Sequence, residues 1–249
     1  MIDLSIPVLI AVIATFFAAG LVKGVTGMGL PTVAMGILGA LISPLAAATL
    51  LIAPSFVTNV WQLVSGPDFI GLLRRLWPMM VAIVVGTVLG SFWIATGDTG
   101  LTTAMLGCAL VIYAAYTLFA RQITVPERVQ TWLSPIIGAT TGIVTGATGV
   151  LVIPAVPYLQ ALNLSKDDLI QALGLSFTVS TVALAVGLGA HGAFDASGLV
   201  LSGLAVIPAL AGMWAGQRIR NRISPPAFRR GFLICLLLLG CEMALRPLL

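Results

Sequence analysis

Two glycine-rich stretches interrupt two long apolar runs of this chain, and they restrict its possible folds more than any other feature. The first, Gly20 to Pro31, reads GLVKGVTGMGLP, and the second, Gly138 to Pro154, reads GATTGIVTGATGVLVIP. Glycine weakens a helix by about 1 kcal/mol relative to alanine. In hydrocarbon, backbone groups freed by a helix break must find partners in the protein or line a cavity. The stretches therefore predict helix breaks at membrane depth that expose backbone N–H groups; close Gly-xxx-Gly helix packing is the alternative.

The composition indicates a polytopic membrane protein. Hydrophobic residues make up 59% of the chain and charged residues 8%, whereas soluble domains carry about 25% charged residues. The net charge of +4 comes mainly from arginines in expected loops. These residues form no basic run interleaved with aromatic side chains, so we expect no nucleic-acid partner; the expected environment is the lipid bilayer.

Apolar segments of spanning length divide the chain into two similar halves, each with one interrupted run followed by three uninterrupted ones. The segments are Ile6–Ile42, Ala46–Val64, Trp77–Ala95 and Leu101–Ala120, then Leu133–Leu162, Ile170–Ala190, Leu199–Ala215 and Phe232–Leu245. Gly86 and Gly90 match Gly212 and Gly216 at a constant offset. We therefore expect an all-α fold with a first transmembrane repeat at 1–120, a cytoplasmic linker at 121–131 and a second repeat at 132–249.

The distribution of basic residues favours re-entrant hairpins at both interrupted runs. If each run enters and leaves on the same side, ten of the 12 basic residues lie in the cytoplasm: Arg74, Arg75, Arg121, Arg128, Lys166, Arg218, Arg220, Arg222, Arg229 and Arg230. This agrees with the positive-inside rule. Each half then crosses the membrane three times, so the halves are inverted repeats and both termini are periplasmic, a frequent transporter design. A kinked single crossing at each break is the alternative.

The two predicted breaks suit a small anion. Inverted hairpins bring their glycine tips together near the midplane, where free N–H groups and positive helix ends attract negative charge. Lys23 adds a positive charge with no acid at comparable depth in its half. The expected binding residues are Lys23, Gly24, Thr26, Gly27, Gly29, Asn59, Thr145, Gly146, Thr148 and Gly149. As alternatives, the threonines bond to their own helices and Lys23 extends toward a surface.

Nothing in the chain predicts an enzyme. There is no Ser-His-Asp set, no HExxH, no paired carboxylate in an apolar segment and no nucleotide-binding GxxxxGKS loop. Cys108, Cys235 and Cys241 lack metal-ligand spacing. We therefore expect no catalytic residue, no metal site and no cofactor.

Taken together, the residues resemble the TauE/SafE sulfite exporter family. A four-segment unit occurs twice, and each copy opens with a GxxxGxxxGxGGG-like run and a later proline. The first motif falls on Gly20, Gly24, Gly27 and Gly29 with Pro31, and the second on Gly138, Gly142, Gly146 and Gly149 with Pro154. The glycine cluster usual in the family is thinned here to Gly27-Met28-Gly29-Leu30, and Ala147 and Thr148 interrupt the second copy.

The resemblance implies passage of sulfite or an organosulfur anion across a bacterial inner membrane by a secondary transporter. A passive anion channel and a non-transporting accessory membrane subunit are the alternatives. The sequence leaves open the exact anion, the direction of transport, whether protons are the coupling ion and whether the chain forms a homodimer.

Overall fold

The computed structural model describes residues 5–120, 123–220 and 222–246, and these residues form ten helices and no strand. The helices are α1 (Ile6–Thr26), α2 (Leu30–Leu41), α3 (Pro44–Val64), α4 (Phe69–Thr96), α5 (Thr99–Phe119), α6 (Glu127–Thr148), α7 (Ala155–Ala161), α8 (Lys166–Ala190), α9 (Ala196–Ile219) and α10 (Pro225–Leu245). The predicted all-α fold is confirmed for this part of the chain.

Six of the described helices are long and apolar enough to cross a membrane: α1, α3, α4, α5, α8 and α9. The helices α6 and α10 are of similar length, but they begin with charged residues, including Glu127, Arg128, Arg229 and Arg230. The helices α2 and α7 follow the two glycine breaks and are short. This set fits a polytopic membrane protein with two interrupted segments.

Most helices begin at a serine or aspartate that caps the first turn. Ser43 and Asp68 accept hydrogen bonds from the backbone N–H groups of Ala46 and Gly71 at the starts of α3 and α4. Ser165 does the same at the start of α8, and Asp167 and Asp168 follow in the first turn, where acidic side chains are favourable. These caps satisfy N–H groups that a helix leaves free.

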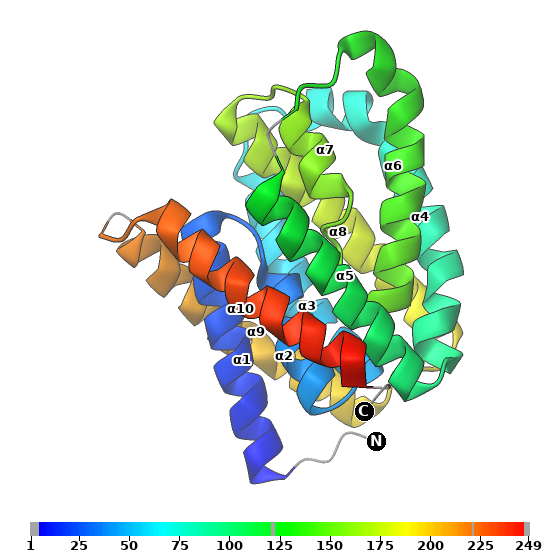
Figure 1. Ribbon diagram of the computed structural model, residues 1–249, viewed down its shortest axis with the longest axis vertical. Helices are drawn as coiled ribbons and strands as arrows, with labels where there is room; N and C mark the ends of the chain where they lie inside the picture. Colours follow the sequence, from blue (N-terminus) through cyan, green and yellow to red (C-terminus); the bar gives the residue numbers. More distant parts are fainter. Residues whose placement is uncertain (1–4, 121–122, 221, 247–249) are drawn as a thin grey trace.

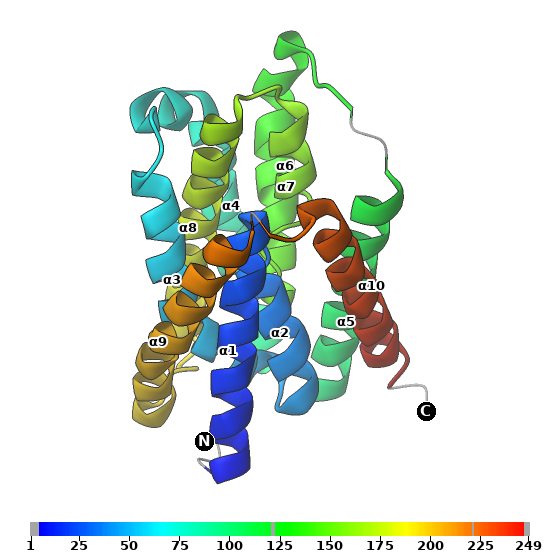
Figure 2. The same ribbon diagram turned by 90° about the vertical axis from the view of Figure 1, so that its left-hand side faces the viewer.

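The chain leaves the helical conformation at both glycine stretches. Gly27 and Gly29 have φ of 81° and 101°, and Gly149 has φ of 72°. An L side chain is strained in this region, so glycine is the residue that fits. Figure 2 shows α1 rising from the lower end of the molecule and α2 returning toward that end, whereas α6 descends from the upper end and α7 lies in the upper part. The broken helices α1 and α6 thus approach their breaks from opposite ends of the molecule.

Each broken helix packs against a helix of the other half. The helices α1 and α9 contact one another along their length, as do α6 and α4. A Cβ atom at Gly20 would lie 2.1 Å from the carbonyl oxygen of Ala209, and one at Gly142 would lie 2.4 Å from that of Ile83. The backbones therefore approach as closely as in other small-residue interfaces between membrane helices.

The contacts repeat in the same register in the two halves. Gly20 faces Ala209 and Met213, and Gly142 faces the matching positions Ile83 and Thr87. The pairs continue, because Gly24 faces Gly216 and Gly146 faces Gly90. Between these two interlocked pairs lie α3 and α8, where the hydroxyl oxygens of Ser55 and Thr181 are 3.1 Å apart.

The start of α1 and the end of α10 lie toward the same, lower end of the molecule (Figure 1). At this end of α10, Arg246 forms an ion pair with Glu242 at 2.9 Å, which the sequence predicts from their one-turn spacing. The terminal residues Met1 and Leu249, which are predicted to be periplasmic, lie outside the described residues, as does Arg121.

Candidate functional site

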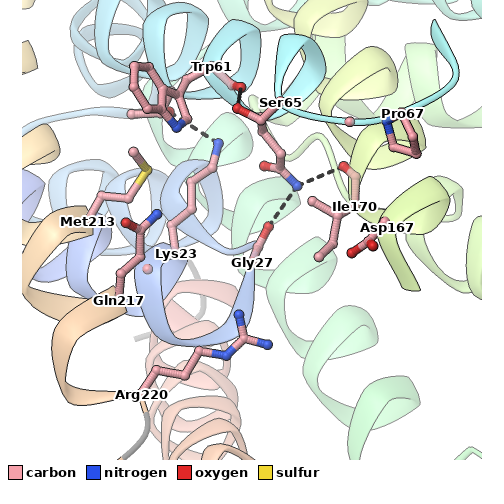
Figure 3. Close-up of a pocket in the computed structure, with 14 residues that line it drawn as sticks. Lys23, Gly27, Trp61, Ser65, Pro67, Asp167, Ile170, Met213, Gln217 and Arg220 are labelled. Carbon is pink, nitrogen blue, oxygen red and sulfur yellow. Dashed lines mark hydrogen bonds between the residues drawn. The ribbon is translucent and has the colours of Figure 1, made fainter. Parts of the chain in front are cut away.

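A cavity of about 440 Å³ adjoins the first glycine break, between α1, α3, α8 and α9 (Figure 3). Its rim carries exposed residues, among them Trp61, Pro67 and Asp167. Buried residues, among them Lys23, Gly24 and Thr58, form its floor. The complete lining is Lys23, Gly24, Gly27, Thr58, Trp61, Gln62, Ser65, Gly66, Pro67, Asp167, Ile170, Met213, Gln217 and Arg220.

Lys23 has a side chain with neutral hydrogen-bond partners. It is 3% exposed and donates from Nζ to Thr58 Oγ1 at 3.1 Å and to Asn59 Oδ1. Among residues 5–120, 123–220 and 222–246, the one ion pair joins Arg246 to Glu242, so Lys23 has no carboxylate partner there. A buried ammonium without a carboxylate partner is costly, so the cavity beside Lys23 favours a negatively charged guest.

Asn59 is held in place from behind the cavity. Its Nδ2 donates to Ser55 Oγ at 2.9 Å, and Ser55 in turn lies within hydrogen-bond distance of Thr181. Thr58 donates to the carbonyl oxygen of Pro54 at 2.8 Å. This network orients the two oxygens that face Lys23 and links the cavity to the contact between α3 and α8.

Gln62 ties the glycine break to α8. Its Nε2 donates to the carbonyl oxygens of Gly27 at 3.1 Å and of Ile170 at 2.9 Å, as Figure 3 shows. The break therefore lies beside the α3–α4 connection and the first turns of α8, close to one end of the helices. This differs from the predicted position near the midplane, because α1 extends for 21 residues before Gly27 and so nearly crosses the bundle.

The helix that follows the first break begins without a side-chain cap. Gly29 is the N-cap of α2 and supplies no side chain to the free N–H groups of the first turn. In that turn, Thr32 is fully buried and its hydroxyl has no hydrogen-bond partner. An uncapped helix N-terminus carries partial positive charge. The N–H groups of this first turn and the Thr32 hydroxyl therefore lack side-chain partners directly after the break.

Thr26 is used within the break itself. Its hydroxyl oxygen lies 2.9 Å from the carbonyl oxygen of Val22 and 2.8 Å from that of Met28, so its one proton is donated to either of them, and it accepts from the N–H group of Met28 at 3.3 Å. Gly29 packs against Val22, where an added Cβ would lie 3.1 Å from a side-chain atom. Neither residue is among those lining the cavity beside Lys23.

The second break has the same local structure as the first but lies apart from the cavity. Thr148 donates to the carbonyl oxygen of Val144 at 2.6 Å and accepts from the N–H group of Val150, the pattern found at Thr26. Thr145 Oγ1 donates to the carbonyl oxygen of Val150 at 3.2 Å. Gly149 would clash with Met35 if it carried a Cβ, at 2.6 Å.

The structural match between the breaks differs by about one helical turn from the sequence match. Sequence spacing pairs Thr26-Gly27 with Thr145-Gly146, whereas the structure pairs Thr26-Gly27 with Thr148-Gly149, since Gly27 and Gly149 are the left-handed C-caps. The counterpart of Lys23 is therefore Thr145: the carbonyl oxygen of Lys23 accepts from the N–H group of Gly27, and that of Thr145 accepts from the N–H group of Gly149. The charged side chain is present at one break and absent from the other.

The ten predicted binding residues thus separate into groups. Lys23, Gly24 and Gly27 line the cavity and Asn59 bonds to Lys23 behind it, whereas Thr145, Gly146, Thr148 and Gly149 are outside the lining. Gly24 and Gly146 also make close helix contacts: an added Cβ would lie 2.2 Å from the oxygen of Met213 and 2.3 Å from that of Thr87. Some glycines of each motif therefore allow close helix packing, and others allow the helix to break.

Sequence reasoning missed the contribution of α9 to the cavity. Gln217 lies in the last turn of α9 and Arg220 is its C-cap, and both line the cavity together with Lys23. Gly212 and Gly216 signal a close helix contact one turn earlier, so their pairing with α1 could have indicated that Gln217 lies near the break. Two cationic side chains, Lys23 and Arg220, then face one space that can bind an anion.

The described parts of the chain contain no group of three or more His, Cys, Asp or Glu side chains that could hold a metal ion.

A sequence model of one protein family matches residues 12–243, nearly the whole chain, and its description is "Sulfite exporter TauE/SafE". No curated protein and no solved structure matches the chain.

Proposed function

Because the chain belongs to the sulfite exporter TauE/SafE family of transmembrane transporters, we propose that it moves a small sulfur-containing anion, sulfite or an organosulfonate, across a bacterial inner membrane by secondary transport. The substrate binds in the cavity beside the first glycine break. Its negative charge is balanced there by Lys23, with Arg220 as a second cation.

One observation carries this proposal: a buried lysine faces a cavity and has neutral partners. Thr58 and Asn59 accept hydrogen bonds from Lys23 but leave its charge uncompensated. A bound sulfite or sulfonate group would supply the missing negative charge through charge-assisted hydrogen bonds. Asp167, on the rim, is the carboxylate that shares the cavity, and its exposure to solvent weakens its effect on Lys23.

The organisation proposed for the membrane is a pair of inverted repeats, 1–120 and 132–249, joined by a cytoplasmic linker at 121–131. Each repeat contributes one re-entrant helix pair, α1–α2 or α6–α7, and three crossing helices. In support, α1 and α6 approach their breaks from opposite ends of the molecule (Figure 2), and their packing contacts repeat in register. The cavity then faces the cytoplasm, the side that holds most basic residues.

In this proposal, anion transport can be coupled to a proton gradient without an acidic side chain in the membrane. The lining of the cavity contains no histidine or glutamate, and its one acid is on the rim. Sulfite is the anion of a weak acid, so it can carry a proton with it. A proton gradient is therefore the proposed driving force.

Transport by the purified chain in liposomes tests the function. Radiolabelled sulfite uptake should be saturable, should exceed sulfate and chloride uptake, and should accumulate when a proton gradient is imposed. Saturable flux without accumulation would indicate a passive channel instead. No flux of any anion would indicate an accessory membrane subunit.

A further inference from the structure

A groove runs along α5: it begins against α1 and α10 at the C-terminal end of α5 and continues along the side that faces α6 and α7. It consists of four neighbouring cavities that share lining residues: the first two share Thr117 and Arg229, the next pair shares Tyr116, Ile123 and Pro157, and the last pair shares Ile112 and Ile153. We call this surface the α5 groove. It is separate from the cavity at Lys23 except that Arg220 lines both.

One end of the α5 groove is strongly basic. A cavity of about 340 Å³ at this end is lined by Arg220, Arg229 and Arg230, together with Thr26 and Thr117. None of the residues lining this cavity is acidic. No ion pair involves these arginines among residues 5–120, 123–220 and 222–246. Guanidinium groups bind the oxygens of phosphate groups in bidentate geometry, so this end suits a phosphate.

The rest of the α5 groove is apolar. The two cavities farthest from the arginines, of about 220 and 450 Å³, are lined almost entirely by hydrocarbon side chains such as Ile112, Leu133 and Ile137. Tyr116 lines both the polar and the apolar parts, where they meet. Tyrosine is enriched at this level in membrane proteins, because its ring is apolar and its hydroxyl group is polar.

From this juxtaposition we propose that the α5 groove binds one anionic phospholipid. Its phosphate group contacts Arg229 and Arg230 at the cytoplasmic end, and one acyl chain lies between α5 and α6. A free inorganic anion would use the arginines but leave the apolar part of the groove without an occupant. A zwitterionic lipid would bring a cation to a cavity that has three arginines and no acid among its lining residues.

The lipid proposal is tested on the full chain in detergent by native mass spectrometry, with phosphatidylglycerol and phosphatidylcholine offered at equal concentration. One phosphatidylglycerol should stay bound, and Arg229→Gln/Arg230→Gln should weaken this binding about tenfold or more. Arg74→Gln/Arg128→Gln is the matched control, since both arginines are exposed and line none of these cavities. Equal losses in both variants would overturn the proposal in favour of general surface attraction.

Two further arms separate the lipid from other occupants. Ile112 is 58% exposed and lines both apolar cavities, so Ile112→Trp should obstruct the acyl chain without disturbing the core and should also weaken phosphatidylglycerol binding. Inorganic phosphate or sulfite should not displace the lipid at millimolar concentration. Displacement by either anion, or unchanged binding in Ile112→Trp, would overturn the lipid assignment. Sulfite flux is not read here, so failure of this proposal leaves the transport proposal intact.

Discussion

At the scale of single residues, the central feature is the contrast between Lys23 and its counterpart Thr145. Both occupy the turn that ends in a left-handed glycine, and the carbonyl oxygen of each accepts from that glycine. Lys23 has Thr58 and Asn59 opposite it, whereas Thr145 bonds to its own backbone at Val150. The pair of breaks therefore provides one cationic site, not two equal ones.

Asn59→Asp tests whether the uncompensated charge matters. A carboxylate next to Lys23 would form an internal ion pair worth up to about 4 kcal/mol at an effective dielectric constant near 20, and it would compete with the substrate. We expect at least a tenfold rise in the KM for sulfite, measured by flux in liposomes. Asn59→Ala removes the hydrogen bond without adding charge and should have the smaller effect; equal effects of the two variants would contradict the electrostatic account.

Thr32→Val separates binding from folding. The buried hydroxyl of Thr32 has no hydrogen-bond partner within the described chain. Its removal should therefore leave the free energy of unfolding unchanged or raise it by up to about 1 kcal/mol. If the first turn of α2 contacts the anion, sulfite flux should fall. A clear loss of stability, measured by thermal unfolding in detergent, would show that the hydroxyl has a structural role instead.

At the scale of helices, the glycine stretches combine two physical requirements. Gly27, Gly29 and Gly149 need positive φ, while Gly20, Gly24, Gly142 and Gly146 allow close backbone contact with α9 or α4. The sequence predicts both uses as alternatives, because a Gly-xxx-Gly spacing is compatible with each. The structure assigns them to successive parts of the same motif.

Gly20→Ala and Gly203→Ala measure the packing requirement. The added methyl group at Gly20 would meet the backbone of Ala209 at 2.1 Å, whereas nothing lies within 4 Å of one at Gly203. We expect Gly20→Ala to lower the free energy of unfolding by about 1–3 kcal/mol. Gly203→Ala should be neutral or stabilising by up to about 1 kcal/mol. Similar unfolding temperatures for both variants would contradict the close α1–α9 contact.

The sequence predicts the helices better than it predicts their partners. Apolar runs and capping residues such as Ser165 indicate where helices lie, and Lys23 stands out because a charge in an apolar run is rare. The contact of α1 with α9 joins segments far apart in the chain, and helix periodicity carries no information about it. For the same reason, Gln217 and Arg220 could not be assigned to the cavity from sequence alone.

At the scale of the whole molecule, the two halves are interlocked. Each broken helix lies against a helix of the other half, and α3 contacts α8 between them. Neither proposed repeat can therefore bury its glycine faces alone, so 1–120 and 132–249 are expected to be structural repeats of one folding unit.

Inverted re-entrant pairs predict that both termini are periplasmic. A reporter enzyme active only outside the cytoplasm, fused after Leu249, should be active. Single cysteines in a cysteine-free chain should react from the cytoplasm at Lys166 and from the periplasm at His191, two exposed positions at opposite ends of α8. A cytoplasmic C-terminus would instead require single crossings at the breaks and would contradict the inverted arrangement.

The most direct test of the central claim is sulfite flux in liposomes for the wild-type chain, Lys23→Gln and Lys166→Gln. Lys166 is an exposed lysine in the first turn of α8 and does not line the cavity, so it controls for loss of one positive charge. The account predicts saturable flux in the wild type and in Lys166→Gln, and at least a tenfold loss of kcat/KM in Lys23→Gln at unchanged thermal stability. Undiminished saturable flux in Lys23→Gln would contradict it.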